Sequence, residues 1–215
     1  MRKMLVLFAA VLMFSAVAPA ALLCTSNPGL PVVVTTGPVS SFECSMGGLT
    51  FSNFSAVAAT ATNPPTNTIV NLTAAQVVGP DVFLTFNPGL TSNQDLYFYF
   101  TVTGPLAGVD LSLSGQNGYS TEIVCSGAIA FDNNCVGGSA FQLARMANIS
   151  GGNPVSSTFP QTNGGSIYKD IMVQGTGELS SITQSFHTVP EPVTFLLIGT
   201  GLIGLGLLRR KARKS

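Results

Sequence analysis

Residues 96–103 have the sequence Leu-Tyr-Phe-Tyr-Phe-Thr-Val-Thr, in which an apolar side chain occupies every second position. Successive side chains of an extended strand point to opposite faces. The segment therefore has one strongly apolar face, formed by Leu96, Phe98, Phe100 and Val102. An alternation of period two predicts a half-buried β-strand rather than a helix.

Other segments of the sequence also have the features of short strands. Residues 109–114 alternate in the same way, and turn sequences such as Asn87-Pro88-Gly89 and Gln116-Asn117-Gly118 separate the apolar segments. Less regular candidate strands lie at 31–36, 49–55, 68–73, 82–86, 119–130, 140–146, 167–173 and 179–186. Short strands at such regular spacing predict an all-β fold, an antiparallel β-sandwich of about eight to ten strands, over residues 21–186.

Charged residues are unevenly distributed along the chain. Between positions 21 and 188 there are eight acidic residues and only two basic ones, Arg145 and Lys169, so this body has a net charge of −6. Nucleic-acid binding requires clustered Lys and Arg to neutralise phosphates. We therefore expect no nucleic acid among the partners.

Residues 1–20 have the three parts of a secretory signal peptide. Arg2 and Lys3 form a cationic start, an apolar run follows, and Ala18 and Ala20 fit a small-residue cleavage site. We expect the general export machinery to recognise this segment and the chain to be cut after Ala20, which places the body outside the cytoplasm.

The four cysteines all lie on the exported side, where disulfides persist. They allow three pairings, and pairing of neighbours is the simplest because each bond closes a short loop. Zinc binding is not expected, since the chain has no C-x-x-C motif and a single histidine, His187. The neighbouring pairs would be Cys24 with Cys44 and Cys125 with Cys135.

The C-terminal residues 187–215 form a second targeting segment. Pro190, Glu191 and Pro192 precede an uncharged run at 193–208. A helix of this length is roughly 24 Å long, a little shorter than the hydrocarbon core of a bilayer, which is about 30 Å thick. We expect a transmembrane helix there, with the body outside by the positive-inside rule. The basic residues that stop the membrane passage are Arg209, Arg210, Lys211, Arg213 and Lys214.

In motif, order and spacing, residues 189–214 resemble the PEP-CTERM sorting domain of Gram-negative bacteria. The resemblance implies that exosortase, a membrane transpeptidase, recognises Pro190, Glu191 and Pro192, removes the tail and transfers the body to the surface. The protein would then be held in the inner membrane only transiently, before the tail is removed. A plain single-span anchor is the alternative, and it differs only in keeping the tail.

The body offers little catalytic chemistry in its sequence. We interpret His187 as a residue of a solvated linker, which leaves a nucleophile without a positioned base. A pair of carboxylates, as in glycoside hydrolases, could arise only if acids distant in sequence met in the fold. The candidates are Asp81, Asp95, Asp110, Glu122 and Asp170.

Two further features bear on ligand binding. The run Asp132-Asn133-Asn134 offers oxygen ligands for calcium but lacks the alternate-residue pattern of an EF-hand, so we interpret it as a turn. Tyr97 and Tyr99 lie on the face opposite Phe98 and Phe100, and this tyrosine face is the candidate platform for a sugar.

Taken together, we expect a non-enzymatic cell-surface or extracellular-matrix protein whose β-domain has a structural or interaction role, with no metal or cofactor. The link to extracellular polysaccharide is implied by the family resemblance only. The alternatives are a carbohydrate-binding module, against which the absence of Trp counts, and a glycoside hydrolase that uses two carboxylates.

Overall fold

The structure is a computed structural model that describes residues 22–24, 32–36, 40–59, 65, 69–130 and 133–189. These residues form nine strands and one short 3-10 helix, η1 (Ser139–Phe141). The strands are β1 (Val32–Thr35), β2 (Cys44–Met46), β3 (Leu49–Ala58), β4 (Val70–Val78), β5 (Asp81–Asn87), β6 (Leu90–Thr91), β7 (Asp95–Cys125), β8 (Gln142–Ile149) and β9 (Val155–Thr188). Within the described residues, no helix is long and apolar enough to span a membrane.

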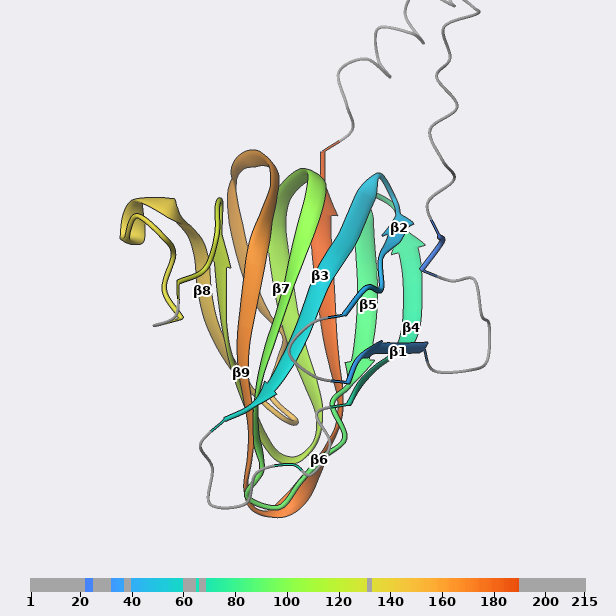
Figure 1. Cartoon of the computed structure of the whole chain (residues 1–215), viewed down its shortest axis with the longest axis vertical. Helices are drawn as coiled ribbons and strands as arrows, with labels where there is room; N and C mark the ends of the chain where they lie inside the picture. The colour runs from blue at the N-terminus through green and yellow to red at the C-terminus, as the bar shows by residue number, and fades with distance from the viewer. Residues whose placement is uncertain are drawn as a thin grey trace, which may run out of the picture.

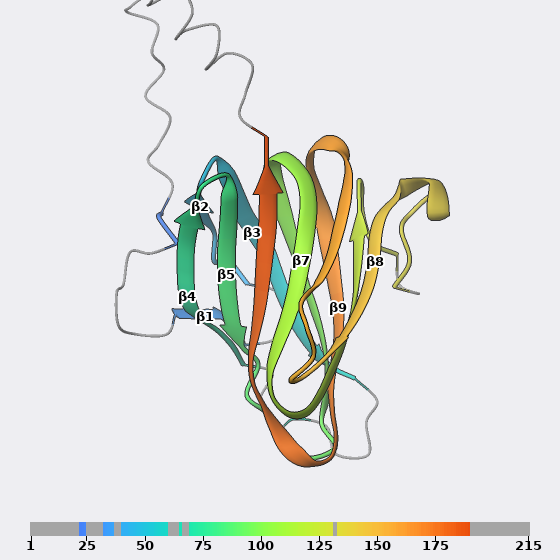
Figure 2. The ribbon, with the colours of Figure 1, turned by 180° about the vertical axis from the view of Figure 1, so that it is seen from behind.

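All strands belong to one antiparallel sheet that curls around the core (Figure 1, Figure 2). Its order is β1-β4-β5-β9-β7-β3-β2, with β6 on β9 and β8 on β7. The expectation of an all-β antiparallel fold is confirmed. The described residues do not form the two separate sheets of the predicted sandwich, because the long strands β7 and β9 each run through both parts of the single curled sheet.

The two long strands divide the curled sheet into two halves that face each other. In the β8 half, residues 164–173 of β9 lie between residues 95–103 and 118–125 of β7, with β2, β3 and β8 outside them. In the β5 half, residues 106–116 of β7 lie between the two ends of β9, next to β5, β4 and β1.

Glycines allow the long strands to bend from one half into the other. Gly104 in β7 has a φ of 127° and Gly164 in β9 has a φ of 121°, both in the region that favours glycine. A Cβ at Gly164 would lie 2.1 Å from the Val102 carbonyl oxygen, and one at Gly104 would lie 2.5 Å from the Gly48 carbonyl oxygen. A period-two pattern contains no sign of such bends, which is why the sequence suggested separate sheets.

The core lies between the two halves and is rich in phenylalanine. Phe51 of β3 contacts Phe186 of β9 with ring centroids 5.0 Å apart, and Phe98 of β7 contacts Phe86 of β5 at 5.2 Å. Aromatic pairs at such distances add to the stabilisation from apolar burial. The predicted apolar face of residues 96–103 is confirmed, since its side chains are at most 2% exposed.

The described cysteines form the two disulfides expected from neighbouring pairing. Cys24 is bonded to Cys44, with Cα atoms 4.9 Å apart, and Cys125 to Cys135, with Cα atoms 5.4 Å apart. The first bond fixes the segment before β1 to β2, and the second closes the loop between β7 and β8.

The predicted targeting segments lie outside the described residues. These are the signal peptide 1–20 with Ala18 and Ala20, the motif Pro190 to Pro192, the helix 193–208 and the basic tail. The β-body itself continues to Thr188 at the end of β9, two residues beyond the predicted limit of 186.

Candidate binding face

All four tyrosines of the chain lie on the outer face of the β8 half, which faces the viewer in Figure 1. Tyr97 and Tyr99 come from the first part of β7, Tyr119 from its last part, and Tyr168 from the strand segment of β9 between them. Tyr99 is directly opposite Tyr168 in the register. The alternation that buries the phenylalanines therefore gathers the tyrosines on the other surface.

Three of the tyrosines form a compact aromatic cluster. The ring centroid of Tyr168 lies 4.9 Å from that of Tyr99 and 5.7 Å from that of Tyr97. Tyr168 is only 4% exposed, whereas the other three tyrosines are partly exposed. The alternation at 96–103 predicted Tyr97 and Tyr99 as the platform, but it contained no sign of Tyr119 and Tyr168, which only the strand register brings to the same face.

The loop closed by Cys125 and Cys135 borders one end of this face. Ile129 and Cys135 belong to the same apolar cluster as Tyr168, and the Tyr99 hydroxyl donates a hydrogen bond of 2.6 Å to Asn133 Oδ1. Asn133 thus supports a tyrosine, in agreement with its interpretation as a turn residue, while Asp132 lies outside the described residues.

A surface hollow of about 590 Å³ lies between this loop and β8. Its lining includes Cys135, Gln142 and Arg145. Arg145 is exposed and pairs in register with Ile123, on the same outer face as the tyrosines. The hollow therefore extends the tyrosine face with a hydrogen-bond donor that is always charged.

Asp95 and Asp170 form a carboxyl pair at the other end of the tyrosine face. Asp170 is opposite Tyr97 in the register and Asp95 is opposite Met172, so both aspartates lie on this outer face. The Oδ1 atom of each is buried without a hydrogen-bond partner. Burial first, and then the charge of Asp170, raises the pKa of Asp95 to about 6. Burial also raises the pKa of Asp170, although its interaction with Asp95 lowers it.

The tyrosine hydroxyls next to this pair remain protonated at neutral pH. Burial, followed by the charge of Asp170, raises the pKa of both Tyr97 and Tyr168 above the usual value of 10.0. Each of these groups is therefore a hydrogen-bond donor as well as an acceptor.

His187 was wrongly interpreted as a linker residue, because it belongs to β9 on the outer face of the β5 half. Its Nδ1 lies 2.8 Å from Asp81 Oδ1 and its Nε2 lies 3.0 Å from Asp110 Oδ1. Burial lowers the pKa of His187, but the hydrogen bonds and charges of the two carboxylates outweigh burial and leave the pKa raised.

The arrangement at His187 fits a structural role better than a catalytic one. Both ring nitrogens are occupied by carboxylates, and the nearby Ser185 hydroxyl donates its hydrogen bond to Asp110 Oδ2 at 2.6 Å. A serine nucleophile would need its hydrogen bond to the imidazole. Among the described residues, no group of three or more His, Cys, Asp or Glu side chains is placed to hold a metal ion.

The fifth candidate carboxylate, Glu122, lies in the core and belongs to neither surface. It forms an ion pair with Lys169, and both side chains are fully buried. The five candidate acids thus divide into three separate places: the pair on the tyrosine face, the pair around His187, and the buried Glu122.

Comparison with known proteins identifies the C-terminal segment. Residues 188–211 match the family model of the PEP-CTERM protein-sorting motif. The chain carries a PEP-CTERM sorting motif. The match confirms the resemblance seen in the sequence and supports an exported protein that is sorted by exosortase. Thr188 and Val189 are the described residues within it.

No curated protein matches the sequence of the chain. Among solved structures, the tailspike protein 4 enzymatically active domain of bacteriophage CBA120 is similar, with 12% identity, a TM-score of 0.29, and coverage of 63% of this chain and 18% of that one. The chain thus spans about a fifth of the tailspike domain.

A second similar structure is the family 11 carbohydrate-binding module from Clostridium thermocellum, in complex with a beta-1,3-1,4-mixed-linked tetrasaccharide. Its identity is 8% and its TM-score 0.23, with coverage of 74% of this chain and 98% of that one. Both TM-scores are too low to show a shared fold.

Proposed function

We propose that the protein is an exported cell-surface or extracellular-matrix protein whose β-domain binds neutral polysaccharide through the tyrosine face, without catalysis. In this proposal the signal peptide directs export, and exosortase of a Gram-negative inner membrane processes the C-terminal segment after its helix has entered the bilayer. The two halves of the curled sheet, which pack like the layers of a β-sandwich, form the scaffold.

The observation that supports binding is the concentration of all four tyrosines on one outer sheet face. A tyrosine ring offers a flat apolar surface against which the C–H groups of a sugar can pack, and its hydroxyl supplies a polar contact at the edge. Rigid strands on both sides hold the rings, so little side-chain freedom is lost on binding.

Charge supports a neutral ligand. The body between residues 21 and 188 has a net charge of −6, and Asp95 and Asp170 lie within the face itself. A polysaccharide with carboxylate or sulfate groups would be repelled, whereas sugar hydroxyls can donate hydrogen bonds to the two aspartates.

Sedimentation with insoluble polysaccharides tests the proposed binding. The secreted protein is mixed with neutral and acidic polysaccharides, and the bound fraction is compared for the wild type, Tyr97→Ala and Tyr119→Ala. Phe83→Ala is the matched control, because Phe83 is a partly exposed aromatic residue of β5, outside the tyrosine face. We expect binding of a neutral polysaccharide that both tyrosine variants lose and the control keeps. Equal binding by all three variants would refute the assignment of the face.

Intact mass tests the sorting step separately. The mature protein is recovered from its native surface and compared with a variant in which Pro190, Glu191 and Pro192 are replaced by alanine. Loss of the C-terminal residues from the native form alone is the expected result. An unprocessed C-terminus in both forms would mean a plain membrane anchor.

A further inference from the structure

Lys169 is the only lysine between residues 21 and 188, and it is fully buried in the core. It shares the inner face of β9 with Ile167 and Ile171, on either side of it along the strand. Burying an ammonium group costs several kcal/mol even after relaxation of the surroundings. The single lysine of the body therefore lies where burial of its charge is most unfavourable.

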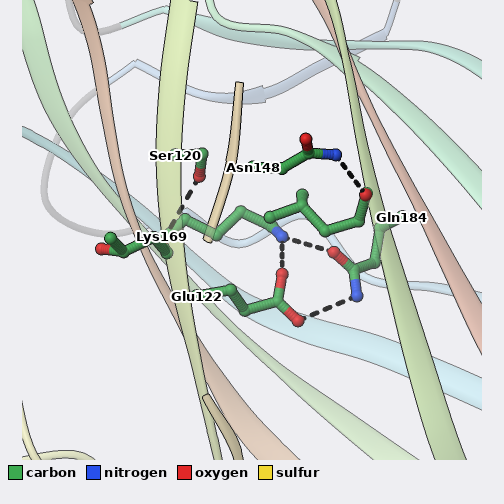
Figure 3. A network of polar contacts seen from close by, with 7 residues as sticks. Ser120, Glu122, Asn148, Lys169 and Gln184 are labelled. Atoms are coloured by element: carbon green, nitrogen blue, oxygen red, sulfur yellow. Dashed lines mark hydrogen bonds and ion pairs between the residues drawn. The ribbon is translucent and has the colours of Figure 1, made fainter. Parts of the chain in front are cut away.

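The Lys169 side chain ends between two other fully buried groups (Figure 3). Its Nζ donates hydrogen bonds to Glu122 Oε2 and to Gln184 Oε1. Gln184 Nε2 in turn donates to the second oxygen of the same carboxylate, Glu122 Oε1, at 3.0 Å. The amine, the carboxamide and the carboxylate thus form a closed ring of contacts.

The three groups come from both halves of the sheet. Glu122 is directly opposite Lys169 in the β8 half, whereas Gln184 belongs to the last part of β9 in the β5 half. A buried ion pair of this kind is often no more stabilising than apolar side chains of similar volume. Stability alone therefore gives a weak reason for the arrangement.

The contacts provide the parts of an amide-forming reaction. A neutral lysine amine is a nucleophile, and burial lowers the pKa of Lys169, although the charge and hydrogen bond of Glu122 raise it. The Gln184 carboxamide is the electrophile, with its oxygen in contact with the amine. Glu122 touches both the attacking nitrogen and the nitrogen that would leave.

We propose that Lys169 and Gln184 become joined by an intramolecular isopeptide bond, with Glu122 as the catalytic proton carrier. Lys169 Nζ attacks the carboxamide carbon Cδ of Gln184, and Glu122 Oε2 accepts the proton from the attacking nitrogen. The bond between Cδ and Nε2 then breaks, and Glu122 returns the proton to the leaving nitrogen through Oε1. A primary amide and an amine give a secondary amide and one ammonia, so the reaction needs no oxidant, cofactor or added reactant.

The core favours this reaction for two physical reasons. The amine is held in contact with the oxygen of the carboxamide that it would attack, and such positioning gives an intramolecular step a large entropic advantage over the same step in solution. Water is excluded from the fully buried site, so hydrolysis does not compete. The product would replace the buried lysine amine by a neutral amide and connect the two halves of the sheet covalently.

Intact mass of the secreted full chain, followed by peptide mapping, tests the proposal. We expect the wild type to be lighter than its processed, disulfide-bonded sequence by the mass of one ammonia molecule. The map should contain a branched peptide that joins Lys169 to Gln184. Lys169→Met should restore the full mass, and Glu122→Ala should reduce the crosslinked fraction at least tenfold.

The remaining outcomes are also decisive. Loss of water instead of ammonia, with a bond from Lys169 to Glu122, would overturn the assignment of Gln184 as the electrophile. A wild type with full mass, or ammonia loss that maps to an Asn-Gly sequence such as Asn117-Gly118, would overturn the crosslink itself. Because the wild-type mass and map decide the question alone, a variant that fails to fold does not leave it open.

Discussion

The Cys125–Cys135 disulfide should control both the stability of the body and the shape of the tyrosine face. We consider the double replacement Cys125→Ala/Cys135→Ala. The bond closes a loop with a sequence separation of 10 residues, and in the chain-entropy model a loop of this size is worth about 3 kcal/mol. For a chain of this length, this loss corresponds to a fall in Tm of roughly 6–12 °C.

Loss of the Cys125–Cys135 disulfide should also change the packing of the tyrosines. Ile129 and Cys135 belong to the apolar cluster of Tyr168, and Asn133 accepts a hydrogen bond from Tyr99. A loop that is no longer closed by the disulfide should lose these contacts. We expect a weaker near-ultraviolet circular dichroism signal from the tyrosines and weaker binding of neutral polysaccharide at a temperature where the variant is still folded.

The other disulfide supplies a matched control. Cys24 and Cys44 are separated by 20 residues, so Cys24→Ala/Cys44→Ala should lower the stability by a similar amount, about 3 kcal/mol. That bond joins β2 to the segment before β1, away from the tyrosine cluster. If both double variants kept the wild-type tyrosine signal and binding, the proposed dependence of the face on the loop would be wrong.

Three further predictions concern single residues. Phe186→Ala should lower the unfolding free energy by about 3–5 kcal/mol in denaturant titration, because the ring is fully buried between the two halves, whereas the exposed Phe141→Ala should change it by less than about 0.5 kcal/mol. His187→Gln should lower Tm more at about pH 5.5 than at about pH 8.5, since a raised histidine pKa adds stability that is lost as the pH rises through the folded value. Asp95→Asn should raise Tm above about pH 6, where the buried carboxyl ionises, and should have little effect below about pH 4.

Each of these predictions can fail in a specific way. Equal losses from Phe186→Ala and Phe141→Ala would mean that the two halves do not pack as described. If His187→Gln changed Tm by the same amount across the pH range, the charged form of His187 would not stabilise the β5 half. A lower Tm for Asp95→Asn at about pH 8 would show that the ionised pair stabilises the fold, contrary to the raised pKa of Asp95.

The sequence predicted the features that depend on local periodicity. The alternation at 96–103 assigned the buried phenylalanines and the outward tyrosines correctly, and the short loops between neighbouring cysteines indicated the disulfides. The period-two pattern also indicates that the body lysine is buried. Lys169 shares its parity with Ile167, Ile171 and Val173, all of which are buried.

Contacts between distant segments could not be predicted in the same way. His187 lies 106 residues from Asp81 and 77 from Asp110 along the chain, and only the pairing of β9 with β5 and β7 brings the three together. The same pairing unites Asp95 with Asp170. Register between strands depends on packing across the whole sheet, which a single sequence does not display.

The passage of β7 and β9 through both halves also determines when the chain can fold. β5 pairs with residues 182–187 of β9, and the two parts of β7 in the β8 half are held together by residues 164–173 of the same strand. Neither half is complete until β9 is available, and folds dominated by such long-range pairing form slowly. A nascent chain whose last strand is still in the ribosome therefore cannot form either half of the sheet completely. Delayed folding of this kind suits an exported protein, because its two disulfides persist in an oxidising compartment outside the cytoplasm.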